Sequence, residues 1–291
     1  MYKIKITLLF TGIICLMVSC STSDKSTDFT AENLFTQGIE GPAVDSEGNL
    51  YAVNFEHEGT IGIVDMQGKA SLYLTLPNGS VGNGIRFDRD DTMYIADYVN
   101  HNVLFVAPGS KEVNVYAHHP ELNQPNDLAI APDGTLYASD PNWKESSGKL
   151  WKVTGEGFEL LEDMMGTTNG IEVSPDGKKL YVNESVQRKI WVYDIDKQGA
   201  LHQKKQFYAF KDYGMDGMRC DNKGNLYVCR YDAGEVVVLN PEAEIIRVIT
   251  LKGKKPTNIA FGGKDGKQCF VTLQDRGCFE TFMAEFPGRE F

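Results

Sequence analysis

The sequence predicts an all-β protein, a six-bladed β-propeller with four antiparallel strands per blade, and the main evidence is one repeated phrase. Turn residues followed by an apolar run with one aromatic residue occur six times along the 291 residues. The six aromatic residues follow one another at intervals of 43 to 46 residues and are Tyr51, Tyr94, Tyr137, Tyr181, Tyr227 and Phe270. A period of this length is typical of a propeller blade, so six copies predict six blades.

The four strands of each blade follow from the pattern inside one period. After the turn and aromatic run "DSEGNLYAVN" come two further short runs of alternating or apolar residues, 60–65 and 69–74. No run keeps a 3.6-residue periodicity, so short antiparallel strands joined by Gly, Asp and Asn turns explain the pattern. The other copies are "DRDDTMYIAD", "APDGTLYASD", "SPDGKKLYVNE", "DNKGNLYVCR" and "GGKDGKQCFVTL". A solenoid is the competing architecture, but no capping repeats are visible.

The two ends of the repeated region predict how the ring closes. The sixth unit ends near "CFETFMAEF" after about three strands, one fewer than a blade needs. The segment "AENLF", residues 31–35, precedes the first unit at the place where an outermost strand would end a blade. We expect this N-terminal strand to close the last blade, because that pairing joins both ends and removes an open sheet edge.

The first twenty residues have the composition of a targeting segment. Lys3 and Lys5 precede an apolar run, 6–18, which is too short to span a bilayer comfortably and is typical of a signal peptide. The residues "VSC", ending at Cys20, resemble a bacterial lipobox, in which the Cys is acylated and becomes the new N-terminus. An ordinary secretory signal that ends in Cys is the alternative.

These features divide the chain into three parts. We expect a lipoprotein signal peptide at 1–20, a flexible polar tether at 21–30 and the propeller at 31–291. The protein would lie in the cell envelope outside the cytoplasm, attached to a membrane only through the lipid on Cys20. We expect a monomer.

Composition limits the partners of the propeller. The formal net charge is −11 and there is no run rich in Lys or Arg, which argues against nucleic acid or anionic lipid as the main partner.

Four cysteines remain after the N-terminal segment, Cys220, Cys229, Cys269 and Cys278. They allow one or two disulfides in an oxidising compartment, although buried thiols are commoner among strand-like runs.

A second alignment of the six units predicts a polar ring on the propeller axis. Eleven or twelve residues before each aromatic marker stands a carboxylate or an amide: Glu40, Asn83, Asn126, Asn169, Asp216 and Asn258. The first strand of each blade lines the central channel, so these side chains would point at one another. Oxygen ligands with two negative charges suit a hard divalent cation, calcium above all, with Zn²⁺, Mn²⁺ or Mg²⁺ as alternatives. The simpler interpretation is that Asn and Asp start strands by bonding to local backbone.

A weaker register lies three residues after each marker. It consists of Asn54, Asp97, Asp140, Glu184, Arg230 and Leu273. Polar strand ends near the ring would support the metal ligands or contact a substrate. We expect Asp140 to take part in substrate binding, although a half-exposed strand end is often polar for solvation alone.

The quoted residues resemble the senescence-marker-protein/gluconolactonase family of six-bladed propellers. The phrases that carry the resemblance are "EGPAVD", "QPNDLAIAPDGTLYASDP", "TTNGIEVSPDGKKLYVNES", "GMDGMRCDNKGNLYV" and "KKPTNIAFGG". The resemblance implies one divalent cation, usually calcium, held by Glu40, Asn169 and Asp216, with Asn126 at or beside the metal. It also implies hydrolysis of sugar lactones or of related substrates. The chain departs from the animal lactonases at Gln124, where those enzymes have a substrate-binding Arg.

The ring and the resemblance together predict metal-assisted hydrolysis of a lactone. The cation would polarise the carbonyl, and Asp216 would act as general base or proton shuttle. The residues expected to contact substrate are Asn126, Gln124, Asp140, Asn83 and Asn258. The alternative is a non-catalytic propeller that binds a sugar, a peptide or a protein at its axial face. A third possibility keeps the fold and replaces the lactone by a strictosidine-synthase-like or phosphotriesterase-like substrate.

Overall fold

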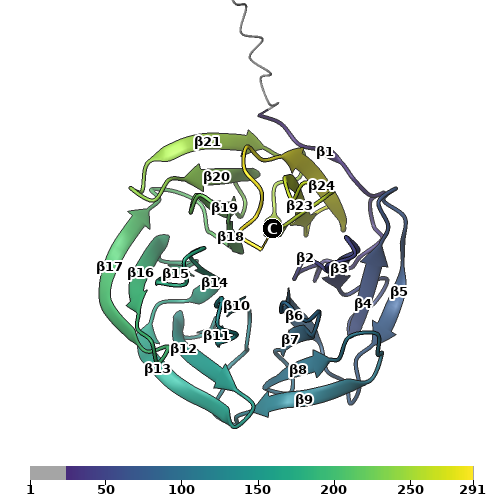
Figure 1. The fold of residues 1–291 in the computed structure, drawn as a ribbon. Coiled ribbons are helices and arrows are strands. Elements are labelled where there is room, and N and C mark those ends of the chain that lie inside the picture. The colour runs from purple at the N-terminus through teal and green to yellow at the C-terminus, as the bar shows by residue number, and fades with distance from the viewer. Residues whose placement is uncertain (1–23, 291) are drawn as a thin grey trace, which may run out of the picture.

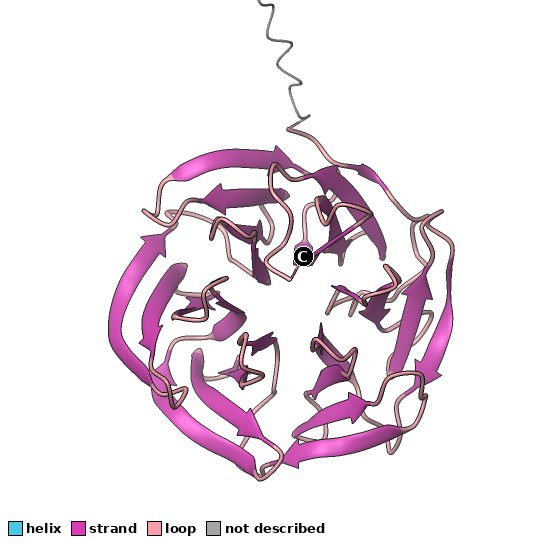
Figure 2. Ribbon diagram, in the orientation of Figure 1, coloured by secondary structure: helices cyan, strands magenta, loops and turns pink. Residues whose placement is uncertain are grey.

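The computed structural model describes residues 24–290, and these residues form the predicted six-bladed β-propeller. Six four-stranded antiparallel sheets surround a central axis, with the first strand of each blade innermost and the fourth outermost (Figure 1). Figure 2 shows that strands and loops alone build the ring. None of the described residues belongs to a helix long and apolar enough to cross a membrane.

The blades follow one another in chain order. The first two contain β2 (Ala43–Val44), β3 (Leu50–Val53), β4 (Thr60–Val64), β5 (Ala70–Thr75), β6 (Gly82–Phe87), β7 (Met93–Asp97), β8 (Asn102–Val106) and β9 (Val113–His118). The next two contain β10 (Leu128–Ile130), β11 (Leu136–Asn142), β12 (Ser147–Thr154), β13 (Gly157–Met165), β14 (Thr168–Val173), β15 (Lys179–Glu184), β16 (Lys189–Ile195) and β17 (Leu201–Ala209). The last two contain β18 (Met218–Cys220), β19 (Leu226–Arg230), β20 (Glu235–Leu239), β21 (Ile245–Thr250), β22 (Pro256–Gly262), β23 (Gln268–Leu273), β24 (Cys278–Met283) and β1 (Thr27–Asp28).

The repeated turn phrase has one local explanation. In the first blade, Asp45 Oδ1 accepts the backbone N–H groups of Glu47 at 3.1 Å and Asn49 at 2.8 Å, which closes the turn between β2 and β3. Gly48 in this turn has a φ of 85°, a conformation that glycine adopts at no steric cost. Asp221 repeats the arrangement in the fifth blade. An Asp with a Gly, or with Asp91 at a φ of 60° in the second blade, therefore fixes where the first two strands reverse.

The hydrophobic core lies between the blades. One cluster packs Tyr51 and Ile61 of the first blade against Ile85 and Leu104 of the second, and each further pair of neighbouring blades has its own cluster. The aromatic markers are part of these contacts, since they lie on the second strand of each blade. The apolar faces consequently pack between sheets, and the polar starts of the first strands remain near the axis.

The ring closes through the N-terminal strand, but at another place than predicted. The closing strand is β1, whose Thr27 and Asp28 pair with β24, and not residues 31–35. Ser26 also bonds to the carbonyl of Thr250 at 3.0 Å, so the described residues of the expected tether 21–30 are part of the propeller. A two-residue polar strand has no hydrophobic alternation, which is why the sequence pattern did not locate it.

The cysteines of the described chain do not pair with one another. The four cysteines of the described chain are free, buried thiols, so the disulfide alternative was wrong.

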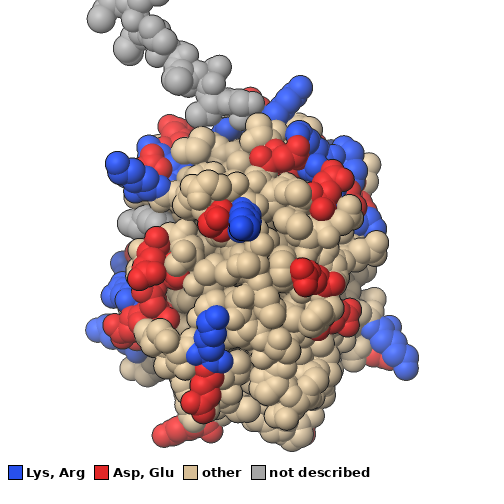
Figure 3. All heavy atoms as spheres, turned by 90° about the vertical axis from the view of Figure 1, so that its right-hand side faces the viewer, with Lys and Arg blue, Asp and Glu red and all other residues tan. Residues whose placement is uncertain are grey.

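Figure 3 shows Lys and Arg side chains interspersed with Asp and Glu on one side of the ring, which is a pattern typical of a solvated surface.

Replacing Phe35 by Ala should loosen the closure of the ring. Phe35 is 4% exposed, and its ring packs edge-on against Phe55 of the first blade and Phe279 of the last. The loss of these contacts should lower the free energy of unfolding by about 3 to 5 kcal/mol. Urea unfolding will measure it, with Leu72→Ala, an exposed side chain on β5, as the control. A Phe35→Ala protein as stable as Leu72→Ala would contradict this role.

Candidate active site

Five of the six predicted ring residues line one cavity at an end of the propeller axis. The cavity has a volume of about 370 Å³, and the five are Glu40, Asn83, Asn126, Asn169 and Asp216. Asn83 and Asn169 belong to the first strands of their blades, and the other three lie two or three residues before theirs. The side-chain amide of Asn83 donates to the carbonyl of Asn126 at 3.1 Å, so neighbouring ring positions hold each other. The sequence register therefore located the inner wall of the cavity.

The first strands approach one another closely. Two glycines, each directly after a ring residue, have no room for a side chain. A Cβ on Gly170 would lie 2.3 Å from the carbonyl oxygen of Asp216, and a Cβ on Gly217 would lie 1.9 Å from the side chain of Asn258. The N–H of Gly217 also donates to the carbonyl of Thr257 in the next blade at 2.7 Å. Packing between blades therefore sets the positions of the ring side chains.

The two ring carboxylates lie beside each other, Glu40 buried and Asp216 half-buried. Glu40 is 7% exposed, and its Oε2 accepts the N–H of Gly41 at 2.7 Å and the amide of Asn258 at 3.2 Å. Burial, and then the negative charge of Asp127, raise the pKa of Glu40 to about 7. Burial and the charge of Glu40 likewise raise the pKa of Asp216 well above its ordinary range. Two such carboxylates repel when both are ionised, and a positive charge between them would relieve the repulsion.

Two amide oxygens in the same cavity are left without a donor. Asn126 Oδ1 and Asn169 Oδ1 are buried and have no hydrogen-bond partner among the residues that the structure describes. Buried polar atoms are nearly always satisfied, so orphaned oxygens indicate a ligand. Carboxylate and amide oxygens are the donors that a hard divalent cation prefers. The side chains of Glu40, Asn126, Asn169 and Asp216 therefore fit such a cation.

This donor set is poor in charged ligands. Within residues 24–290, no group of three or more His, Cys, Asp or Glu side chains is placed to hold a metal ion. The candidate set contains only two carboxylates, Glu40 and Asp216, and its other donors are neutral amides. Calcium accepts such mixed oxygen ligands in flexible geometry, whereas zinc prefers nitrogen and sulfur.

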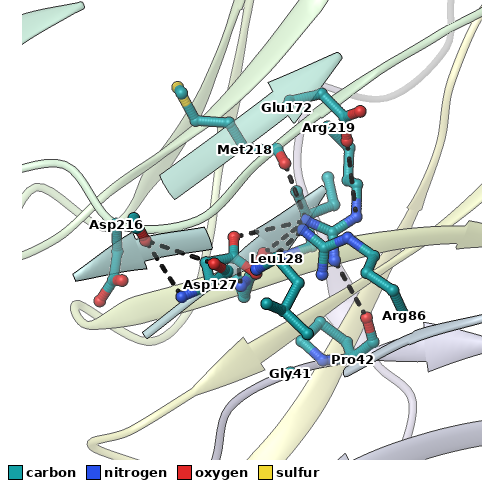
Figure 4. A network of polar contacts seen from close by, with 12 residues as sticks. Gly41, Pro42, Arg86, Asp127, Leu128, Glu172, Asp216, Met218 and Arg219 are labelled. Carbon is teal, nitrogen blue, oxygen red and sulfur yellow. Dashed lines mark hydrogen bonds and ion pairs between the residues drawn. The ribbon is translucent and has the colours of Figure 1, made fainter. Parts of the chain in front are cut away.

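A layer of buried charges supports the ring from behind (Figure 4). Asp127 is fully buried; its Oδ1 lies 2.9 Å from Arg86 Nη2 and its Oδ2 lies 3.7 Å from Arg219 Nη1. Asn258 donates to Glu40 and to Asp127 and accepts from Arg219 at 3.2 Å. Asn258 was predicted to contact substrate, but the structure places it behind the cavity wall, where it ties Glu40 to the charged layer.

Asp140 was also predicted to contact substrate, and it lies outside the cavity wall as well. Its Oδ1 accepts the backbone N–H groups of Asn123 at 2.8 Å and Gln124 at 2.7 Å, and its Oδ2 accepts the indole N–H of Trp151 at 3.0 Å. Burial raises the pKa of Asp140 although these donors oppose the shift. Asp140 therefore holds the loop that carries Gln124, and Gln124 itself lines the cavity.

The outer wall of the cavity comes from residues that sequence reasoning missed. Four of them stand four residues after an aromatic marker, one position beyond the register considered: Tyr98, Ser185, Tyr231 and Gln274. The hydroxyl of Tyr231 donates to Gln274 Oε1, so this wall is tied together. Trp143 is 45% exposed and takes the corresponding place in the third blade, directly after β11, which is longer than the other second strands. The fourth position directly follows the end of the second strand in these four blades, and of the third-residue register only Asn54 lines the cavity.

The fold and this cavity define a class of protein, the six-bladed propellers with an oxygen-donor site on the axis. Within that class, the chain belongs to the SMP-30/gluconolactonase/LRE-like family, whose model matches residues 38–275. The matched range includes every ring residue and most of the cavity wall.

Individual relatives are distant but cover much of the chain. A gluconolactonase of Zymomonas mobilis subsp. mobilis is 27% identical over 215 residues, which are 65% of this chain and 60% of the relative. A regucalcin of Xenopus laevis is 27% identical over 260 residues, 80% of this chain and 85% of the relative. The solved structure of a calcium-binding protein, regucalcin, from Agrobacterium tumefaciens superposes with a TM-score of 0.79 at 20% identity, covering 92% of this chain and 98% of the other. The last comparison establishes the shared fold.

The metal-free protein should lose stability as the pH rises through the range set by Glu40. The pKa of Glu40 in the folded protein is about 7 and its ordinary value is 4.5, so folding favours the protonated carboxyl. The stability it contributes is present below its ordinary pKa and is lost as the pH rises through the folded pKa. This shift corresponds to roughly 3 kcal/mol in the free energy of unfolding.

Urea unfolding across this pH range will measure the effect in protein stripped of divalent cations. The control is Glu40→Gln, which lacks this carboxyl and should lose less stability over the same range, with Asp216 as the raised carboxyl that remains. If both proteins lose the same stability between acidic and neutral pH, another group is responsible.

Proposed function

We propose that the protein is a hydrolase that opens a lactone of a sugar or a related small molecule with the help of a divalent cation, preferably calcium. One observation carries the proposal: two carboxylates with raised pKa values share a cavity with two orphaned amide oxygens. This arrangement suits a cation that also binds a carbonyl oxygen. Relatives named gluconolactonase support the same class of reaction.

The walls of the cavity favour a neutral, hydroxyl-rich substrate. Its polar lining consists of amides and hydroxyls such as Gln37, Gln124 and Ser185, and no Lys, Arg or His is among the described residues that line it. Tyr98 and Trp143 add flat apolar surfaces of the kind on which sugar rings pack. A phosphorylated or sulfonated lactone would lack a partner for its negative charge. We therefore expect an uncharged sugar lactone.

The protein residues would bind the cation and handle one proton. When bound by Glu40, Asn126, Asn169 and Asp216, a divalent cation supplies a Lewis acid for the carbonyl oxygen of the lactone. Both carboxylates are then ionised, because a nearby positive charge lowers their pKa. Asn83, which lines the same cavity, orients the substrate beside them.

Asp216 acts as the general base of the reaction. It accepts a proton from the water molecule whose oxygen attacks the carbonyl carbon. The bond between that carbon and the ring oxygen then breaks, and the proton passes to the leaving ring oxygen. Water is thus added across the ester, and the product is an open-chain hydroxy acid that releases a proton in solution.

Replacing Asp216 by Asn should abolish turnover and leave the propeller folded. The loss of the general base and of one cation ligand should lower kcat/KM for a neutral sugar lactone by about 10² to 10⁴. Hydrolysis of a panel of lactones, each tested with calcium, manganese, magnesium and zinc, will measure it. The matched control is Asp265→Asn, an exposed acid in the turn before β23, which should keep full activity.

Chelation tests the cation directly. Removal of divalent cations should abolish hydrolysis, and the return of calcium should restore it. Full activity of the stripped protein would refute the metal-dependent mechanism. Calcium binding without hydrolysis of any lactone in the panel would instead favour a propeller that binds a sugar, a peptide or a protein without chemistry.

We also propose that the propeller is anchored in the cell envelope by a lipid on Cys20. Cys20 lies outside the described residues, so the proposal depends on the lipobox-like "VSC" of the sequence. The full-length protein should enter the membrane fraction of a bacterial host, and mass spectrometry should find an acylated Cys20. Cys20→Ser should release the protein from the membrane, and an unmodified Cys20 in wild-type protein would refute the anchor.

A further inference from the structure

A second cavity opens on the axis on the far side of the charged layer. Its volume is about 320 Å³, and its lining shares no residue with the candidate active site. Four arginines contribute to it: Arg86 and Arg219 from the first strands of two blades, Arg289 from the C-terminal segment, and Arg89, which is exposed. Aromatic and aliphatic side chains, among them Phe87 and Phe261, complete its walls.

Three of these arginines are deeply buried. Arg86 is 3% exposed, Arg219 is 4% exposed, and the Arg289 side chain is 6% exposed. Two buried carboxylates accompany them: Asp127 lies 2.9 Å from Arg86, and Glu172 lies 2.6 Å from Arg289. The third guanidinium, that of Arg219, is no closer than 3.7 Å to either carboxylate. The layer therefore holds one more buried positive charge than it neutralises at close range.

Hydrogen bonding leaves unsatisfied atoms of both kinds in the layer, since Glu172 Oε2 has no donor among the described residues. Arg86 Nε is buried and has no acceptor among the residues of the described chain. Arg219 Nη1 donates to the carbonyl of Met218 and to Asn258, which are neutral acceptors. Burial and the neighbouring Arg219 lower the pKa of Arg86 to about 10, which indicates two guanidinium groups that repel each other. Figure 4 shows these two side chains next to each other between Asp127 and Glu172.

The acidic residues at the mouth of this cavity do not supply the missing negative charge. Asp45 and Asp88 each accept backbone N–H groups of their own turns, and Asp91 accepts from Ser46. Glu290 lies 3.3 Å from Arg289 at the rim and is 44% exposed. The three aspartates are therefore held by turns, and Glu290 pairs with Arg289.

We propose that this far cavity binds a small organic or inorganic oxyanion, a carboxylate or a phosphate, between Arg86 and Arg219. A guanidinium presents parallel N–H donors that match the oxygens of these groups. The apolar side walls accommodate the remainder of a small organic anion, and a cavity of this size is at the lower end of those that bind small molecules. The site is separate from the candidate active site and does not depend on the proposed lactonase activity.

Calorimetric titration of the full propeller with inorganic phosphate, and separately with acetate, tests the proposal. Each probe should bind saturably at one site per chain, in calcium-loaded and in calcium-free protein alike. Binding that requires calcium would place the anion at the other cavity and would overturn the proposal. The absence of saturable binding by either probe, which would leave water as the occupant, would overturn it as well.

Three variants locate the site. Arg86→Gln should weaken binding at least tenfold, and Ala260→Leu, which fills the cavity without changing its charge, should do the same. Lys197→Gln, an exposed lysine in the turn between β16 and β17, removes an equal charge and should bind as wild type does. If Arg86→Gln fails to fold, Ala260→Leu decides alone. Wild-type affinity in Ala260→Leu would refute the location.

Discussion

The candidate site depends on how closely the first strands approach the propeller axis. Ring side chains are held by the neighbouring blade: Asn183 Nδ2 donates to the carbonyl of Asp216 at 2.6 Å, and Thr257 Oγ1 donates to the carbonyl of Ile39 beside Glu40 at 2.8 Å. The second contact joins the last blade to the first, so the closure of the ring also sets the position of Glu40. The positions of the ring residues therefore depend on all six blades together, and the apolar clusters between the blades maintain these positions.

The same closeness creates an electrostatic cost. Glu40, Asp216 and Asp127 lie close together. The charge of Asp127 helps to raise the pKa of Glu40, and the charge of Glu40 helps to raise the pKa of Asp216. A cavity built only for stability would contain apolar side chains here, since buried charges seldom contribute to folding. Orphaned oxygens on Asn126 and Asn169 add to the cost. Strain of this kind persists where a ligand relieves it, and a cation relieves all of these contacts at once.

Much of this arrangement could be predicted from the sequence, because repetition converts weak local signals into a register. A single Asn before a strand says little, whereas six matched positions placed Glu40 and Asp216 on the axis. The prediction failed where the repeat gives no information. The polar strand at Thr27–Asp28 has no alternation, and Trp143 lies six residues after its aromatic marker because β11 is longer than the second strands of the other blades. Asp140 was assigned to substrate because the register was one residue from the cavity wall.

The buried ionic layer was not predicted, since only three of its five members share a register and that register is apolar in the other three blades. Arg86, Glu172 and Arg219 lie three residues after ring positions, whereas Asp127 directly follows one and Arg289 arrives from the C-terminal segment. The layer is polarised along the axis: Asp127 faces Glu40 and Asn258, and the guanidinium groups line the opposite cavity. Its negative end favours a cation at the ring, and its positive end favours an anion in the far cavity. One set of buried charges thus gives the two ends of the channel opposite ligand preferences.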